Sequence, residues 1–145
     1  MPYARISLRK GKPPEYLAAL SDSLHRALVE TFEVPEDDRF QVFHQHEPGE
    51  LVYDPHYLGG PRSDDYVLIA ITAGRPREAQ TKHAFYRRLA DLLEASPGIR
   101  SEGVMVVITT VRPEDWSFGN GLATLARTGS DGSHIARDRD SARSS

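Results

Sequence analysis

The sequence predicts an α/β (α+β) fold in which a β-α-β unit occurs twice and forms one four-stranded sheet with two helices on the same face. The main observation is an internal repeat, because residues 3–15 align with residues 66–78 at an offset of 63 residues. A tyrosine, an isoleucine, a glycine, a proline and a glutamate recur in register, as does a basic residue before the proline. Each copy reads as strand, turn and helix, and another strand follows it. The 145 residues suit one domain with a real core.

The first copy predicts a strand at residues 2–8, a helix at 14–32 and a strand at 40–43. Pro13 can open the helix, because the first helical turn does not use the missing N–H. Apolar residues recur along the helix at spacings of three and four, which predicts one buried face. These residues are Leu17, Leu20, Leu24, Leu28 and Phe32.

The second copy predicts a strand at 67–71, a helix at 77–95 opened by Pro76, and a strand at 104–108. One side of this helix is apolar, with Phe85, Leu89, Leu92 and Leu93. Right-handed crossovers then give two parallel strand pairs in one sheet, with both helices on the same face.

The remaining segments read as turns. Residues 47–64 hold several Pro and Gly turn signals, and residues 51–53 are the one candidate strand among them. We place the domain at 1–126, including the irregular segment 112–126. Residues 127–145 are rich in Ser, Gly, Arg and Asp and are expected to form a flexible tail.

The two central strands predict an oligomer. Residues 67–71 and 104–108 are apolar at nearly every position, which is typical of strands buried on both faces. The helices cover only one face, and the chain has no further element for the other. A partner subunit in a closed homo-oligomer is the simplest cover.

Composition excludes several classes of function. The formal charge of −3 gives no basic field for nucleic acid or an anionic membrane. The chain has no cysteine, which removes disulfides, thiolate metal sites and cysteine nucleophiles. It also shows no signal-peptide core and no apolar segment of membrane-spanning length. We therefore expect a soluble, cytoplasmic protein.

Pro2 is the residue with the most distinctive chemistry. If Met1 is removed, Pro2 carries a free secondary amine, which can accept a proton, donate one or attack a carbonyl. An α-amino group titrates at about 7.7–8.0. If Met1 stays, the nitrogen is an amide and this chemistry is lost.

Pro2 on a chain of this pattern resembles the tautomerase superfamily, which uses an amino-terminal proline in catalysis. Three further segments resemble malonate semialdehyde decarboxylases within that superfamily. They are the run from Phe32 to Gln41 around Asp38, the Arg75-Pro76-Arg77 turn, and residues 115–119. The resemblance covers about residues 2–126.

This resemblance implies a homotrimer with no metal and no organic cofactor. The implied reaction is decarboxylation of malonate semialdehyde, or a similar small carboxylate-bearing 3-oxo acid, with hydration of acetylenic 2-oxo acids as a side activity. Two alternatives stay open. One is a keto–enol tautomerase of phenylpyruvate-like acids that uses neutral Pro2 as a base, and the other is a trimeric binding protein without catalysis.

The resemblance also assigns the site residues. Pro2, Asp38, Arg75 and Arg77 are the catalytic group, and the two arginines suit a substrate carboxylate because guanidinium groups bind it bidentately. Asp38 is favoured over its neighbour Asp37 by the match to Asp-Arg-Phe-Gln. The pocket walls are assigned to Trp116, Phe118 and Leu125. Beyond Leu125 the chain is polar where the family is apolar.

The histidines give weaker signals. His44 and His46 would share one strand face near Glu47 and His56, but a metal site needs three or four convergent ligands, so a surface strand is preferred. His25 lies on the first helix and is expected to be exposed or interfacial.

Overall fold

The computed structural model describes residues 1–125, and the predicted tail at 127–145 lies outside the described residues. The chain divides into two compact units. The larger unit comprises residues 1–73 and 77–109, and the smaller comprises, among the described residues, 74–76 and 110–125.

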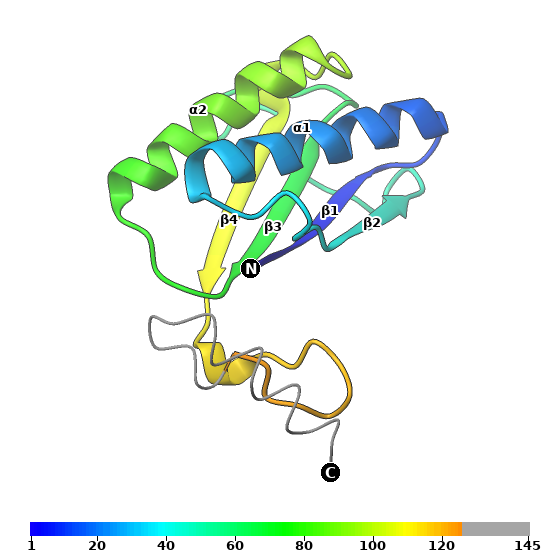
Figure 1. The fold of residues 1–145 in the computed structure, drawn as a ribbon. Coiled ribbons are helices and arrows are strands. Elements are labelled where there is room, and N and C mark those ends of the chain that lie inside the picture. The colour runs from blue at the N-terminus through cyan, green and yellow to red at the C-terminus, as the bar shows by residue number, and fades with distance from the viewer. Residues whose placement is uncertain (126–145) are drawn as a thin grey trace. The chain divides into compact units, whose positions relative to one another are not determined.

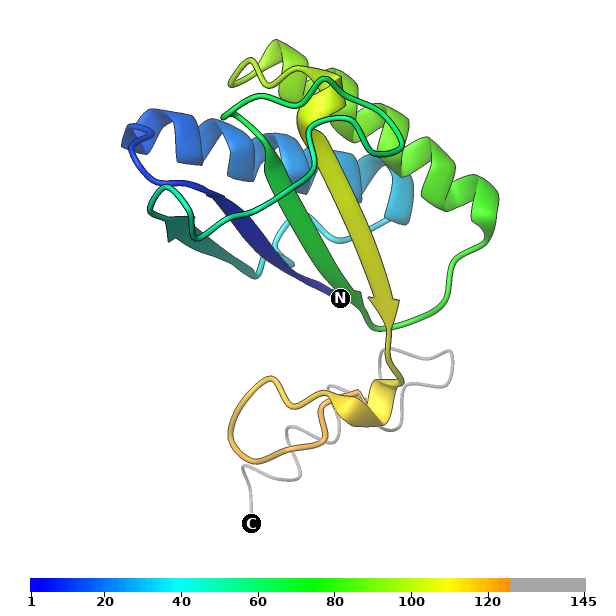
Figure 2. The same cartoon turned by 180° about the vertical axis from the view of Figure 1, so that it is seen from behind.

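A four-stranded sheet forms the base of the larger unit (Figure 1). Its strands are β1 (Pro2–Arg9), β2 (Gln41–His46), β3 (Val67–Ala73) and β4 (Val104–Thr110). Their order is β2-β1-β3-β4, with β1 parallel to β2 and antiparallel to β3. Figure 2 shows β3 and β4 running in the same direction. The predicted pair of β-α-β units in one sheet is confirmed.

Two long helices cover one face of this sheet (Figure 1). Helix α1 spans Pro14–Phe32, as predicted, with Pro13 at its N-cap. Helix α2 spans Ala79–Ala95 and begins two residues later than predicted. Its N-cap is Glu78 in an extended conformation, so Pro76 does not open the helix. Among the described residues, neither these helices nor any other is long and apolar enough to cross a membrane.

The core lies between the helices and the sheet. Alternate residues of β1 and β3 point toward the helices, as the two-residue repeat of a strand requires. The apolar stripes predicted on both helices meet these strand residues. The members with an exposed fraction of 1% or less include Ile6, Leu20, Leu24, Phe32, Ile69, Ile71, Phe85, Leu89 and Leu93.

The other face of the sheet carries exposed apolar side chains. Val42 on β2 is 40% exposed, and Met105 and Val107 on β4 are 48% and 47% exposed. Apolar side chains this exposed on one face of a sheet are typical of a surface that a partner covers. The apolar character predicted for both faces of β4 is therefore present.

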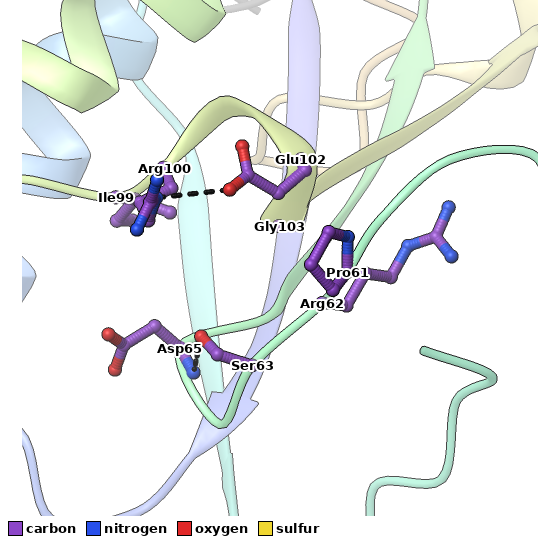
Figure 3. A pocket seen from close by; sticks show the side chains of 8 residues that line it. All are labelled: Pro61, Arg62, Ser63, Asp65, Ile99, Arg100, Glu102 and Gly103. Carbon is purple, nitrogen blue, oxygen red and sulfur yellow. Dashed lines mark hydrogen bonds and ion pairs between the residues drawn. The ribbon is translucent and has the colours of Figure 1, made fainter. Parts of the chain in front are cut away.

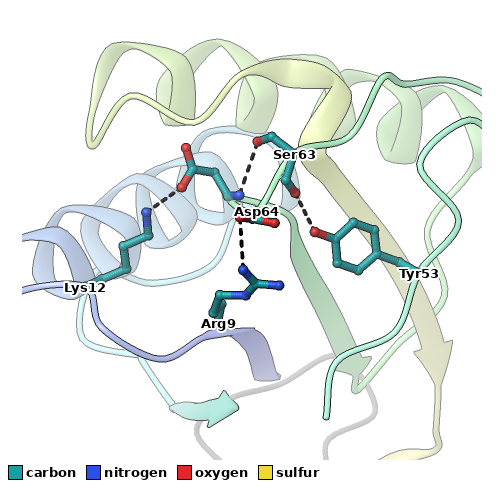
Figure 4. A network of polar contacts seen from close by, with 6 residues as sticks. Arg9, Lys12, Tyr53, Ser63 and Asp64 are labelled. Atoms are coloured by element: carbon teal, nitrogen blue, oxygen red, sulfur yellow. Dashed lines mark hydrogen bonds and ion pairs between the residues drawn. The ribbon is translucent and has the colours of Figure 1, made fainter. Parts of the chain in front are cut away.

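The loop between β2 and β3 is irregular, and the candidate strand at 51–53 is wrong. Side-chain contacts, not strand pairing, stabilise this segment. The Tyr53 ring stacks on the Tyr66 ring at 4.1 Å between centroids, and the Tyr53 hydroxyl donates to the Ser63 carbonyl at 2.6 Å (Figure 4).

Ion pairs connect the end of the same loop to the end of β1 and the segment between β1 and α1 (Figure 4). Arg9 pairs with Asp64 at 2.9 Å, and Lys12 pairs with Asp65. The hydrogen bond with Asp65 raises the pKa of Lys12. These pairs are largely exposed, and each contributes about 0–1 kcal/mol to the stability of the fold.

Candidate active site

Pro2 lies at the end of the sheet where β3 finishes. It is buried, and its backbone is opposite Ala73, the last residue of β3, in the antiparallel ladder. The chain continues from Ala73 into the segment that carries Arg75 and Arg77. The amino terminus therefore lies beside the end of β3.

Asp38 contacts the amino terminus directly. Its Oδ2 atom lies 2.6 Å from the α-amine of Met1, and its side chain is only 12% exposed. The other carboxylate oxygen, Oδ1, is buried and accepts no hydrogen bond from any residue within 1–125. Because Pro2 follows Met1 immediately, removal of Met1 would create the new amine beside this carboxylate. Asp37 is exposed.

Arg77 is held at the carboxyl end of helix α1. Its Nη2 atom donates to the Phe32 carbonyl at 3.3 Å, and its guanidinium carbon lies 4.5 Å from the centre of the Phe32 ring. A helix C-terminus carries partial negative charge, which favours a guanidinium there. Asp38 lies six residues after Phe32, so both site residues are placed by the end of this helix.

The other four predicted residues belong to the smaller unit. Arg75 is exposed, and Leu125 is buried with 6% of its surface exposed. The Trp116 and Phe118 rings stack at 5.5 Å between centroids and 14° between planes. The Phe118 N–H donates to Thr124 Oγ1 at 3.0 Å, which holds the turn after this aromatic pair.

The histidines of β2 lie among polar groups of the sheet. His44 Nε2 accepts a hydrogen bond from Arg5 Nε at 3.1 Å. Within residues 1–125, no three His, Asp or Glu side chains are grouped as a metal ion would need.

A cavity of about 320 Å³ lies at the opposite end of β3 (Figure 3). Its lining comes from the loop before β3 and the segment before β4, and includes Arg62, Asp65, Arg100 and Glu102. Arg100 is paired with Glu102 at 3.0 Å. This cavity is remote from Pro2, since β3 begins beside it and ends opposite Pro2.

Sequence reasoning missed two residues that hold the site. His25 was expected to be exposed or interfacial, and that expectation is wrong, because it is only 4% exposed and its Nε2 lies 2.8 Å from the Glu36 carbonyl. The available signal was its position three residues before Leu28, at the border of the apolar stripe. Phe32 was recognised as a core residue, but its contact with Arg77 joins two distant segments and has no local signal.

The candidate site combines a duplicated β-α-β sheet with an amine and a carboxylate paired at the start of the chain. Comparison with known proteins gives the family. A family model described as tautomerase enzyme matches residues 38–119, and a second model with the same description matches residues 2–60. The chain belongs to the tautomerase superfamily and is a tautomerase-family enzyme.

Two curated relatives come from Bacillus subtilis (strain 168). The chain is 40% identical to probable tautomerase YusQ over 125 residues, which cover 86% of this chain and 98% of that protein. It is 37% identical to probable tautomerase YrdN over 123 residues, which cover 85% of this chain and 95% of that protein.

Solved structures with this fold include two malonate semialdehyde decarboxylases. One, described as having decarboxylase and hydratase activities, is 36% identical with a TM-score of 0.81, covering 85% of this chain and 95% of that one. The other, the FG41 enzyme inhibited by 3-bromopropiolate, is 34% identical with a TM-score of 0.78, covering 84% and 92%. A fused 4-OT symmetric trimer, 20% identical with a TM-score of 0.70 over 86% and 98% of the two chains, shares the fold.

Proposed function

We propose that this protein decarboxylates malonate semialdehyde or a similar small 3-oxo acid, using Pro2 as its amino terminus and no cofactor. The observation that carries the proposal is the 2.6 Å contact between the Met1 α-amine and Asp38, because it puts this carboxylate beside the peptide bond whose cleavage would free the Pro2 nitrogen. It joins a titratable amine to a largely buried carboxylate. The 36% identity to a malonate semialdehyde decarboxylase supports this substrate class.

The proposed role of Pro2 follows from the charge that the reaction creates. When the bond between the carboxylate carbon and the neighbouring carbon breaks, its electron pair moves into an enolate whose charge rests on the former carbonyl oxygen. A protonated Pro2 amine would donate a hydrogen bond to that oxygen and stabilise the charge as it develops. A proton added to carbon then gives acetaldehyde beside carbon dioxide. An iminium formed by Pro2 is a second route to the same electron sink.

Arg75 and Arg77 are proposed to bind the substrate carboxylate. Guanidinium groups pair with carboxylates through two parallel hydrogen bonds, which would fix the orientation of the carboxylate that leaves. The contact with Phe32 supports this role for Arg77, because it restrains the guanidinium before substrate arrives. Trp116, Phe118 and Leu125 are proposed as pocket walls that exclude water.

Asp38 is proposed to keep the Pro2 amine protonated and oriented through Oδ2. Its buried Oδ1 accepts no hydrogen bond from the described residues, so it could accept one from a water. An activated water at that position would support the hydratase side activity.

We also propose a homotrimer. The support is the exposed apolar face of the sheet around Val42, Met105 and Val107. The name of one structural neighbour describes it as a symmetric trimer.

Keto–enol tautomerisation is the second candidate, favoured by the names of the two curated relatives. In that reaction neutral Pro2 would remove a proton from carbon and return one at the other end of the enol system. The same residues would bind the substrate, so the protonation state of Pro2 separates the two candidates.

Product analysis tests the proposal. The Met1-free enzyme should release carbon dioxide and acetaldehyde from malonate semialdehyde, and Pro2→Ala should fold but lose most of this activity. The kcat/KM for decarboxylation should fall as pH rises and the amine loses its proton. Phenylpyruvate tautomerisation that rises over the same pH range, without carbon dioxide release from malonate semialdehyde, would replace decarboxylation with the second candidate.

A further inference from the structure

Asp38 lies in a segment that has a hydrogen bond to a distant part of the chain on each side of it. The segment joins helix α1 to strand β2 and contains the turn in which the Asp38 N–H donates to the Pro35 carbonyl at 3.0 Å. Two residues before Asp38, the Glu36 carbonyl lies 2.8 Å from His25 Nε2. Two residues after it, the Phe40 carbonyl accepts from the Ala4 N–H at 3.0 Å.

The hydrogen bonds at Glu36 and at Phe40 differ in kind. The bond at Phe40 is a backbone bond that extends the pairing of β1 with β2, so it is part of the sheet itself. The bond at Glu36 comes from a side chain, and because a carbonyl oxygen only accepts, His25 Nε2 is the donor. His25 thus makes a specific, side-chain-dependent contact with the Asp38 segment.

A third contact on the same segment is weaker. Arg39 pairs with Asp22 at 2.7 Å, but the two side chains are 41% and 73% exposed. Exposed pairs of this kind contribute about 0–1 kcal/mol and hold geometry poorly. The imidazole of His25, by contrast, is 4% exposed and is packed within the buried face of α1.

We propose that His25 is a positioning residue that places Asp38 against the amino-terminal amine through its hydrogen bond to Glu36. The inference rests on the proposed function of Pro2 and Asp38, and it assigns His25 no contact with substrate. Without the bond, residues 35–38 would be held only by contacts outside the turn, from the buried Val34 before it and from Arg39 and Phe40 after it. The carboxylate would then sample positions beyond hydrogen-bonding distance of the amine. A displacement of about 1 Å in a catalytic arrangement can lower a rate by up to about a hundredfold.

The test compares substitutions at His25 that differ in reach. His25→Gln places an amide N–H where it can still reach the Glu36 carbonyl, whereas His25→Asn is too short to do so. His25→Leu removes the donor at similar volume. Asp22→Asn, which breaks only the exposed pair with Arg39, is the matched control, and Asp38→Asn sets the effect of removing the carboxylate charge.

The measurement is the titration of the Pro2 amine, followed by NMR in Met1-free protein labelled at Pro2, together with kcat and KM. We expect His25→Leu and His25→Asn to move the amine's titration at least halfway toward that of Asp38→Asn. Their kcat should fall roughly tenfold with little change in KM. His25→Gln and Asp22→Asn should behave like the wild type. If His25→Leu does not fold, the amine titrations of His25→Asn and His25→Gln are sufficient to test the proposal.

Two outcomes would overturn the proposal: an unchanged amine titration in His25→Asn, or a titration in His25→Gln that is shifted as far as in His25→Asn. Neither outcome depends on which substrate the enzyme uses. A shifted titration in an enzyme that releases no carbon dioxide would keep the role of His25 and reject the decarboxylase. Normal carbon dioxide release together with an unshifted amine titration in His25→Asn would keep the decarboxylase and reject the role of His25.

Discussion

Arg77 has two contacts with Phe32 that affect how its role can be tested. The hydrogen bond to the Phe32 carbonyl and the packing over the Phe32 ring both support the end of α1. Removal of the Arg77 side chain is therefore expected to affect the stability of the fold as well as substrate binding. Arg75 is exposed and belongs to the smaller unit.

Removal of Met1 is required by the proposed chemistry, because an amide nitrogen neither holds a proton near neutral pH nor attacks a carbonyl. We expect the active protein to lack Met1 and any fraction that retains it to be inactive. Intact-mass spectrometry of separated fractions, with activity measured on each, checks this. Full activity in a homogeneous preparation that retains Met1 would exclude Pro2 as the catalytic amine.

Replacing Arg75 or Arg77 by Ala should weaken the binding of a charged substrate. The lost charge-assisted hydrogen bonds are worth about 1.5–3 kcal/mol, which corresponds to a ten- to hundredfold drop in kcat/KM. An aldehyde analogue without the carboxylate should be affected much less. Arg77→Ala should also lower the free energy of unfolding by about 1 kcal/mol, the scale of a cation–π contact.

The control for the loss of charge is Arg77→Lys, which keeps the positive charge but not the planar guanidinium group. This variant should retain part of the binding of charged substrates. Equal losses on charged and uncharged substrates in the Ala variants would indicate structural damage instead of a lost carboxylate contact.

At the scale of secondary-structure elements, the sequence predicted those features that depend on local residue patterns. The repeat and the apolar spacings located four strands and two helices, and the ends of α1 were predicted correctly. The candidate strand at 51–53 was wrong because Tyr53 is held by ring stacking and by a bond to Ser63, both formed with residues farther along the chain.

The same reason explains what sequence alone could not give for the candidate site. Pro2, Asp38 and Arg77 could be proposed from a family resemblance, which local physics does not supply. Their supports could not, because the contacts of His25 with Glu36 and of Arg77 with Phe32 depend on how the chain folds back. Arg77 makes its contact with Phe32 from the segment before α2, which begins only after the extended N-cap Glu78.

The contact between α1 and α2 includes an exposed ion pair between Arg88 and Glu30 and a buried hydrogen bond from Ser23. Ser23 is 8% exposed, and its hydroxyl donates to the Ser96 carbonyl, which follows the last residue of α2, at 2.6 Å. Ser23→Ala would leave that carbonyl without this donor, so we expect the free energy of unfolding to fall by about 1 kcal/mol or somewhat more. Urea denaturation at fixed protein concentration measures the change.

Thr31→Ala is the matched control for this prediction. Among the described residues, its hydroxyl bonds to the Ala27 carbonyl one turn earlier in the same helix, and such local bonds contribute little. Thr31→Ala should therefore be nearly neutral. A loss in Thr31→Ala as large as that in Ser23→Ala would show that the bond between the helices has no particular weight.

At the scale of the whole molecule, the uncovered face of the sheet is the feature that the single chain does not account for. The helices bury one side of β3 and β4, while apolar residues of β2 and β4 are exposed on the other. Val107 is the better position for a test than Met105. The Met105 sulfur accepts a hydrogen bond from the Tyr66 hydroxyl at 3.1 Å, so its replacement would disturb the chain before β3 as well.

We expect the wild-type protein to be a trimer and Val107→Asp to dissociate it. A carboxylate at that position would be buried without a partner in the assembly, at a cost of several kcal/mol, whereas in a monomer it would be solvated. Light scattering over a range of concentrations measures the mass of each. The control is Tyr86→Asp on helix α2, where the side chain is 38% exposed and lies away from the sheet face, and this variant should stay trimeric. If the wild type is a stable monomer at micromolar concentration, or if both variants dissociate alike, then this face is not the interface, and the exposed apolar residues need another explanation.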